Sequence, residues 1–168
     1  MERVIEVVNV SFNTLMTIIL IFGILFVVLF VIGIEPFVVV SGSMEPSIKV
    51  GSLCFINKHT KYSDIKVQDI IAYTAITGNK VTHRVVNITD EGMETKGDRN
   101  NISDGISVTE KNFIGKNVFS VPRLGFMVSA MQTPRGKIIT ITIAIVIFVA
   151  AFFVDDGKGK RVKKKVVK

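Results

Sequence analysis

The feature that most constrains the fold of this chain is the segment 14–34, which carries no charged side chain. Its central part, Ile18–Ile32, is apolar on every face, unlike an amphipathic helix at the surface of a globular domain. At about 1.5 Å of rise per residue, the segment is long enough to cross a bilayer core of about 30 Å. We therefore predict a transmembrane helix over residues 14–34.

The residues that follow this helix argue against a cleaved signal peptide. Such a peptide has an apolar region of about 7–15 residues, followed by a cleavage site made of small residues. Here the apolar run is longer, and the sequence that follows it is Glu35-Pro-Phe-Val. We therefore predict that the first span is a retained anchor.

A second uncharged apolar segment, residues 138–154, is only just long enough to span a membrane. Thr140 and Thr142 weaken that interpretation, and a buried core helix is the alternative. The flank favours a span, because the basic tail 155–168 follows directly and supplies most of the net charge of +7. A basic tail beside an apolar helix marks the cytoplasmic side and contacts anionic lipid, so nucleic acid is not an expected partner.

The two spans predict a multi-pass protein of the cell membrane with both termini in the cytoplasm. Its predicted parts are a cytoplasmic or interfacial lead (1–13), a transmembrane helix (14–34), an extracytoplasmic β domain (35–137), a second transmembrane helix (138–154) and a basic cytoplasmic tail (155–168). The bilayer is therefore an expected partner.

Between the spans, short strands separated by turn residues predict a mainly β fold. No convincing amphipathic helix occurs before about residue 125. Gly78-Asn79 is typical of a hairpin tip, and a short β-branched run over residues 38–40 leads into a turn. The other predicted strands are 51–57, 69–74, 80–88, 92–96 and 114–125, the last ended by Pro122.

The only cysteine, Cys54, excludes an intramolecular disulfide. It is predicted to be a small packed side chain, because a thiol nucleophile would need an exposed and activated thiolate. The sequence shows no Cys/His spacing typical of a metal site and no glycine-rich phosphate loop. We expect no metal and no cofactor.

Ser41-Gly42-Ser43 forms the first candidate for chemistry. Ser-Gly-Ser is ordinary turn sequence, and Pro46 ends any regular element soon after it. Its position changes that interpretation, because the turn follows the first span by only a few residues and must lie at a membrane face. Ser43 is therefore a candidate nucleophile.

Two further residue types needed for acyl transfer follow in the chain. Strand periodicity places His83 on one face of its strand and Lys80 on the other. A structural histidine is the alternative interpretation. The loop 97–105 carries Asp98 and Asp104, which also suit loop capping. A serine needs an imidazole to accept its proton, and the imidazole needs a carboxylate to orient it, so this set suits nucleophilic acyl transfer.

Four motifs in order resemble the conserved boxes of type I signal peptidases, specifically the endoplasmic-reticulum-type branch that also occurs in archaea and some Gram-positive bacteria. The resemblance covers the predicted β domain and the anchor before it. The main bacterial branch has a lysine where this chain has His83, which implies a Ser-His-Asp centre. The motifs are Ser41–Ser47, Val81–Val86, Thr95–Asp104 and Ile114–Gly125.

The resemblance implies a membrane-bound serine endopeptidase that removes signal peptides from secretory preproteins. It implies that Ser43 is the nucleophile, Ser41 an oxyanion donor and His83 the base. Asp104 matches the catalytic acid and Asp98 a second carboxylate, although the loop could present either one.

The resemblance also implies shallow apolar subsites for small residues at positions −1 and −3 of an extended substrate. Val38, Val39 and Val40 are candidates to pair with that substrate by β-addition. Met44 is a candidate to line its pocket, although insertion into lipid or a place in the core are alternatives. Further subunits stay open.

Two rival functions remain at this point. One is a membrane-tethered binding or assembly protein that keeps the fold without catalysis. The other is a serine peptidase of the same fold that uses Lys80 as its base.

Overall fold

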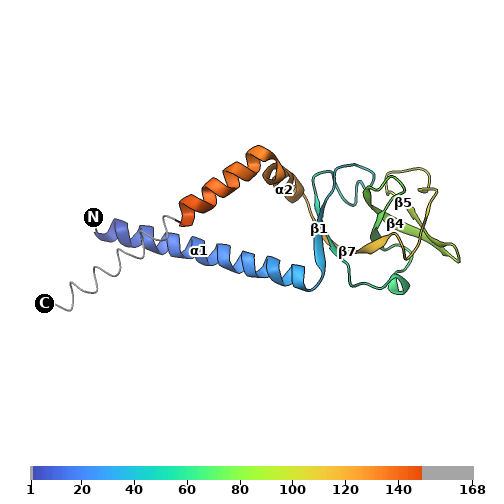
Figure 1. Cartoon of the computed structure of the whole chain (residues 1–168), viewed down its shortest axis with the longest axis horizontal. Helices are drawn as coiled ribbons and strands as arrows, with labels where there is room; N and C mark the ends of the chain where they lie inside the picture. The colour runs from blue at the N-terminus through green and yellow to red at the C-terminus, as the bar shows by residue number, and fades with distance from the viewer. Residues whose placement is uncertain (1, 149–168) are drawn as a thin grey trace. The chain divides into compact units, whose positions relative to one another are not determined.

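The computed structural model describes residues 2–148, and side chains from Val10 onward. Its contacts divide the chain into two units, of which Leu25–Ser129 holds the sheet and the candidate site. Figure 1 shows a long N-terminal helix and a domain of strands joined by loops. The prediction of a mainly β fold is confirmed, with one apolar helix at its N-terminal end.

Helix α1 (Glu2–Val31) is longer than the predicted span, because the predicted lead 1–13 continues as helix from Glu2. The part Val10–Val31 is long and apolar enough to cross a membrane, and none of it is buried. The helix ends at Val31 and is followed by a turn with Gly33, whose φ of 77° is favourable for glycine. That turn sends the chain directly into the first strand.

The described part of the second apolar segment, residues 138–148, belongs to a helix that begins at Pro134. Helix α2 (Leu124–Gln132) is followed by helical residues Pro134–Phe148, and the two are bent by 94°. Thr133 explains the new start, because its Oγ1 accepts a hydrogen bond from the Gly136 N–H at 3.0 Å while proline begins the helix. The end of the predicted span, 149–154, and the basic tail 155–168 lie outside the described residues.

Seven strands form one antiparallel sheet in the order β1-β2-β7-β3-β4-β5-β6. The prediction missed the two-residue strand β6 and a 3-10 turn at Tyr62–Asp64. The strands are β1 (Ile34–Val38), β2 (Leu53–Asn57), β3 (Ile70–Thr74), β4 (Lys80–Thr89), β5 (Gly92–Lys96), β6 (Ser107–Val108) and β7 (Phe113–Val121).

Strand β1 corrects one prediction. It ends at Val38, so Val39 and Val40 lie beyond the strand, and it includes Pro36. Proline is tolerated there because β1 is an edge of the sheet. The β-branched run 38–40 thus marks the exit from a strand that begins immediately after the helix.

Strand β3 separates two core clusters, because successive side chains point to opposite faces. Ile71 and Tyr73 pack in one cluster, and Ala72 packs in the other. The Ala72 cluster includes Cys54, whose side chain is fully buried. Burial raises the pKa of the Cys54 thiol to about 11, so Cys54 stays protonated and packs as a small apolar side chain, as predicted.

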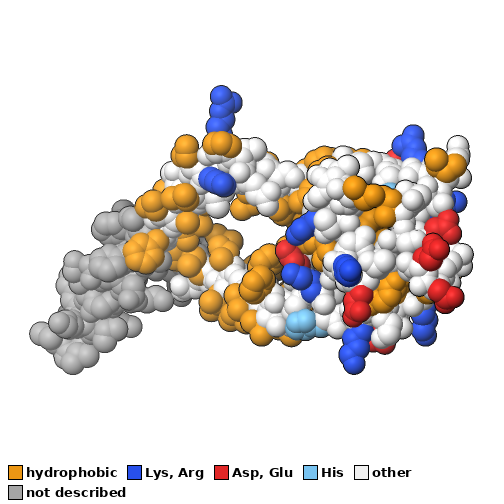
Figure 2. All heavy atoms as spheres, turned by 45° about the vertical axis from the view of Figure 1, so that its right-hand side comes forward, with side chains coloured by type: hydrophobic (Ala, Val, Ile, Leu, Met, Phe, Trp, Pro, Cys, Tyr) orange, Lys and Arg blue, Asp and Glu red, His pale blue; other side chains and the backbone are white. Residues whose placement is uncertain are grey.

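The helical segments and the sheet domain differ in surface character. Figure 2 shows charged side chains distributed over the sheet domain, whereas the helical segments carry mainly hydrophobic ones. Large apolar side chains of α1 such as Phe22, Phe30 and Val31 are more than 60% exposed. This exposure in water would be unfavourable, so the helix is suited to a lipid environment.

Candidate active site

The turn after β1 holds the first residue of the site, Ser43. The next residue, Met44, is 2% exposed and anchors the turn in the core, and its carbonyl accepts the Ile48 N–H at 2.8 Å. The Ser43 carbonyl accepts the Arg99 N–H at 2.8 Å, which ties the turn to the loop after β5. These attachments therefore hold the backbone at Ser43 in place.

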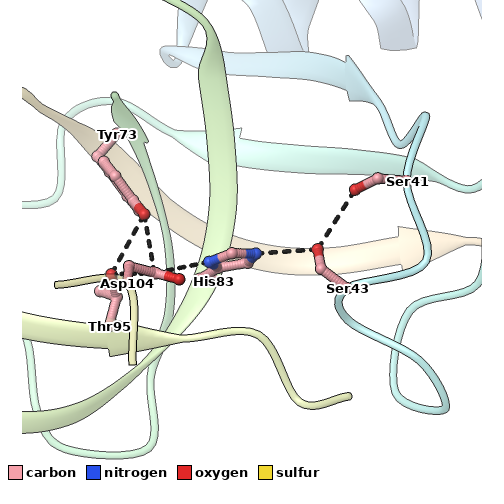
Figure 3. A network of polar contacts seen from close by, with 6 residues as sticks. All are labelled: Ser41, Ser43, Tyr73, His83, Thr95 and Asp104. Atoms are coloured by element: carbon pink, nitrogen blue, oxygen red, sulfur yellow. Dashed lines mark hydrogen bonds and ion pairs between the residues drawn. The ribbon is translucent and has the colours of Figure 1, made fainter. Parts of the chain in front are cut away.

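His83 lies on β4, between β3 and β5 in the sheet, and is 7% exposed. Its neighbour on the same face, Val85, is fully buried, as the strand alternation predicts. The His83 Nε2 atom lies 2.9 Å from Ser43 Oγ, although the two residues are 40 positions apart (Figure 3). The fold thus brings the predicted serine and histidine into direct hydrogen-bond contact.

Asp104 completes a chain of hydrogen bonds from the other side of the ring. Its Oδ2 lies 2.7 Å from His83 Nδ1 (Figure 3). Burial of the carboxyl opposes its ionisation, but hydrogen bonds from His83 and Thr95 outweigh that effect and hold the pKa of Asp104 below its usual range. An ionised carboxylate only accepts hydrogen bonds, so Nδ1 carries the proton and Nε2 is free to accept one from Ser43.

Asp98 occupies a different environment from Asp104. Its two oxygens pair with the Arg84 guanidinium, with Oδ1 2.8 Å from Nε and Oδ2 2.7 Å from Nη2. The hydrogen bond from Arg84 is the main cause that lowers the pKa of Asp98. Arg84 also donates to the Gln68 carbonyl at 2.8 Å, so this pair joins the Asp98 loop to β4 and to the turn before β3. The structure therefore brings Asp104, and not Asp98, to the histidine.

The surroundings of the Ser43 hydroxyl contain two hydrogen-bond donors. The Ser41 Oγ lies 3.3 Å from Ser43 Oγ (Figure 3). Within the residues that the structure describes, the Ser43 N–H has no hydrogen-bond acceptor. Both groups are therefore available to a negatively charged oxygen that forms beside Ser43.

The four residues that were predicted to contact the substrate lie in two different environments. Val38 ends β1, where it pairs with Leu53, and Val40 is 83% exposed. Val39 exchanges backbone hydrogen bonds with the segment before β2. Met44 instead belongs to the core cluster of Ala72, so the alternative in which it enters lipid is wrong. At 2% exposure, Met44 supports the turn from beneath rather than presenting an open surface.

Lys80 is separated from the serine by the strand alternation. Its Nζ lies 3.8 Å from Glu35 Oε1 and 4.5 Å from the centre of the Phe37 ring. Both partners belong to β1, and the lysine side chain is 56% exposed. A lysine base for Ser43 therefore has no support in this geometry.

Two residues beside Asp104 were not predicted. Tyr73 donates to Asp104 Oδ2 at 2.9 Å, and Thr95 donates to the same oxygen at 2.6 Å (Figure 3). The strand register could have indicated both residues. Tyr73 pairs with Val81 and Thr95 pairs with Val85, and both valines share a face with His83. Over residues 2–148, no group of three His, Cys, Asp or Glu side chains forms a metal site.

A partly buried Ser-His-Asp relay defines a class of site, that of nucleophilic acyl transfer by an activated serine. Comparison with known proteins adds the family. The family model described as signal peptidase, peptidase S26, matches residues 11–118, and the chain belongs to this family. The matched range contains Ser43, His83 and Asp104.

Two curated relatives agree with the family. Signal peptidase I W of Bacillus subtilis (strain 168) is 37% identical over 78 residues, which cover 44% of this chain and 41% of the relative. The signal peptidase complex catalytic subunit SEC11 of Colletotrichum graminicola (strain M1.001 / M2 / FGSC 10212) is 33% identical over 102 residues, covering 54% of this chain and 59% of the relative. The matches thus span about half the length of these relatives.

Proposed function

We propose that this protein is a membrane-bound serine endopeptidase that removes signal peptides from secretory preproteins. The observation that carries the proposal is the continuous contact from Ser43 Oγ through His83 to Asp104, with distances of 2.9 and 2.7 Å. It occurs in a chain of the signal peptidase family. The alternative of a binding protein without catalysis is disfavoured, because each member of the relay is present and within hydrogen-bond distance of the next.

In this mechanism Ser43 Oγ attacks the carbonyl carbon of the scissile bond while His83 Nε2 takes its proton. The resulting imidazolium is stabilised by the Asp104 carboxylate, and it then gives the proton to the leaving amine. Water then attacks the acyl carbon while His83 Nε2 takes one of its protons. The imidazolium returns that proton to Ser43 Oγ as the ester bond breaks, which releases the acid and restores the free enzyme. Each proton transfer uses His83 Nε2, and the Asp104 contact keeps the ring in one tautomer.

The tetrahedral intermediate needs donors for its negative oxygen. We assign this role to the Ser43 N–H and the Ser41 hydroxyl, which lie beside the nucleophile. Loss of one such donor typically raises the barrier by about 2.7–4 kcal/mol, or about 10²–10³ in kcat. Ser41→Ala should therefore slow cleavage without abolishing it.

The substrate is proposed to bind as an extended strand along Val38–Val40. This segment is close in sequence to Ser43 and continues from the edge strand β1, so its backbone is suited to β-addition. Small residues at positions −1 and −3 are expected, as in the family. Preproteins carry an apolar segment in the bilayer, which suits an enzyme whose serine follows its own apolar helix closely.

The membrane arrangement is part of the proposal. Residues 14–34 are assigned as one span and residues 138–154 as the second. The predicted β catalytic domain, 35–137, then lies on the extracytoplasmic side and the tail 155–168 in the cytoplasm. Protease added outside sealed, right-side-out vesicles should leave the tail intact, and digestion of the tail would reject the second span.

The proposal is tested with a model preprotein in vesicles that contain the full chain. Ser43→Ala should abolish cleavage, with a loss of at least about 10⁴-fold, because the nucleophile is removed. Ser41→Ala serves as the matched control, since it removes a neighbouring hydroxyl and should leave partial activity. Processing that survives Ser43→Ala would reject the assignment of the nucleophile.

A further inference from the structure

Asp104 has no regular secondary structure of its own to position it. It lies in the loop between β5 and β6, whereas its partner His83 is fixed in the middle of the sheet. The Asp104 N–H donates to the Thr95 carbonyl at 2.9 Å, and the Thr95 hydroxyl donates back to the Asp104 carboxylate at 2.6 Å. A single strand residue therefore holds both the backbone and the side chain of Asp104.

The strand on the other side of β4 supplies a second support. Tyr73 on β3 is 2% exposed, and its hydroxyl donates to the same Asp104 oxygen at 2.9 Å. Thr95 is fully buried, and its hydroxyl also lies 3.3 Å from the Tyr73 hydroxyl. Because Thr95 has one hydroxyl proton, the shorter contact to Asp104 is its hydrogen bond. One carboxylate oxygen thus accepts from Tyr73, Thr95 and His83 together (Figure 3).

This concentration of donors on one oxygen has a chemical consequence. Each hydroxyl stabilises the negative charge of Asp104, and burial together with the neighbouring carboxylate raises the pKa of Tyr73 to about 12, so the phenol keeps its proton. The hydroxyls also compete with His83 for the charge on that oxygen. They therefore moderate how strongly the carboxylate holds the imidazole proton, in addition to fixing the position of the carboxylate.

We propose that Tyr73 and Thr95 are positioning residues, which hold the Asp104 carboxylate against His83 and set how readily His83 takes up a proton. The inference rests on the proposed function, since it assigns the two hydroxyls to the same catalytic relay. Neither residue contacts the substrate in this assignment, so both act through Asp104. Asp98, which pairs with Arg84, also interacts with the charge of His83, and the variants below leave this pair unchanged.

The test compares hydroxyl deletions with conservative replacements in the full chain, reconstituted with a model preprotein. Tyr73→Phe and Thr95→Val should each lower kcat by about ten-fold or more, equivalent to about 1.4 kcal/mol of barrier, with KM unchanged. Thr95→Ser keeps the hydroxyl and should restore most of the rate. In Tyr73→Phe the acid limb of the activity profile should move to higher pH. The Asp104 carboxylate then accepts from one donor fewer, so it stabilises the protonated form of His83 more strongly.

A matched control for the tyrosine is available in the same core cluster. Tyr62 donates its hydroxyl to the Val108 carbonyl at 2.8 Å, away from the catalytic relay. Tyr62→Phe removes a comparable hydrogen bond and should leave kcat and the pH profile unchanged. In an Asp104→Ala background, Tyr73→Phe should cause no further loss in kcat, because there is no carboxylate left to position.

A second measurement keeps the outcome independent of turnover. The chain contains two histidines, so the imidazole signals of His83 and the exposed His59 can both be followed by NMR in detergent micelles. Tyr73→Phe should move the titration of His83 to higher pH and leave that of His59 in place. Tyr62→Phe should move neither.

The outcomes separate this inference from the proposed function. If Tyr73→Phe and Thr95→Val keep wild-type kcat and Tyr73→Phe leaves the titration of His83 unchanged, while Ser43→Ala abolishes cleavage, then the positioning role is wrong and the function stands. If Ser43→Ala still cleaves the preprotein, the proposed Ser43 mechanism is wrong, and the catalytic part of the inference is rejected with it. If Tyr62→Phe lowers kcat as much as Tyr73→Phe does, the effect belongs to general packing and the inference is overturned.

Discussion

Asp98 and Asp104 lie six residues apart in one loop, and the structure predicts opposite consequences for their replacement by asparagine. In Asp104→Asn the amide oxygen is expected to take the place of Oδ2, because three donors converge there. The tautomer of His83 is then preserved, and the loss is that of the negative charge. Asp98→Asn instead removes the charge that pairs with Arg84.

The geometry gives the size of each effect. With His83 Nδ1 and Asp104 Oδ2 at 2.7 Å, the centres of charge in an imidazolium–carboxylate pair are about 4 Å apart, which is worth about 4 kcal/mol at an effective dielectric constant of 20. Loss of that stabilisation corresponds to about 10³-fold in kcat. Asp98→Asn should change kcat by less than about ten-fold, while weakening charge-assisted hydrogen bonds worth about 1.5–3 kcal/mol of folding stability.

The assay is single-turnover cleavage of a model preprotein in vesicles, with the unfolding free energy of each variant measured in parallel. Asp104→Asn should be slow, whereas Asp98→Asn should be active and less stable than wild type. If Asp98→Asn loses as much activity as Asp104→Asn, or if Asp104→Asn stays within ten-fold of wild type, the assignment of the two carboxylates is refuted.

Three further predictions follow from the same structure. The pKa of Asp98 is lower in the folded state than in the unfolded chain. The stability that its carboxylate contributes is therefore complete above the usual carboxyl pKa of about 3.9 and is lost as pH falls through the folded value. In urea unfolding, the free energy of unfolding should fall less on acidification in Asp98→Asn than in wild type. Gly97→Ala would place a Cβ 2.7 Å from the Ser43 carbonyl oxygen, which is too close, so Ser43 must move. A displacement of about 1 Å should lower kcat by about 10²-fold, and a wild-type kcat in this variant would contradict the prediction. Lys80→Ala should leave the rate of cleavage unchanged, whereas a rate as low as that of His83→Ala would support a lysine base.

The strand positions were largely predictable because the sequence alternates cleanly. Strand periodicity correctly placed His83 and Val85 on a buried face and Lys80 on the opposite one. Strand β1 was misplaced, because Pro36 interrupts the apolar pattern that marks a strand. Its position at the sheet edge makes that proline acceptable, and this is a property of the topology and not of the local sequence.

The choice between Asp98 and Asp104 was beyond the reach of the sequence. Both lie in an irregular loop, where no periodicity relates a residue to the strands. Which aspartate contacts His83 depends on Arg84, which binds Asp98 through two hydrogen bonds, and on buried hydroxyls that hold Asp104. Tyr73 is an instructive case, because its pairing with Val81 in the structure places it on the same face as His83, yet a buried tyrosine is by itself an ordinary core residue.

The central claim is that the Ser43 oxygen forms a covalent bond with the substrate. The most direct measurement is acid quenching of the full chain during cleavage of a preprotein, followed by peptide mapping by mass spectrometry. We predict an ester between the signal peptide carbonyl and Ser43, absent from Ser43→Ala. An acyl group on any other residue, or cleavage by the Ser43→Ala protein, would contradict the account.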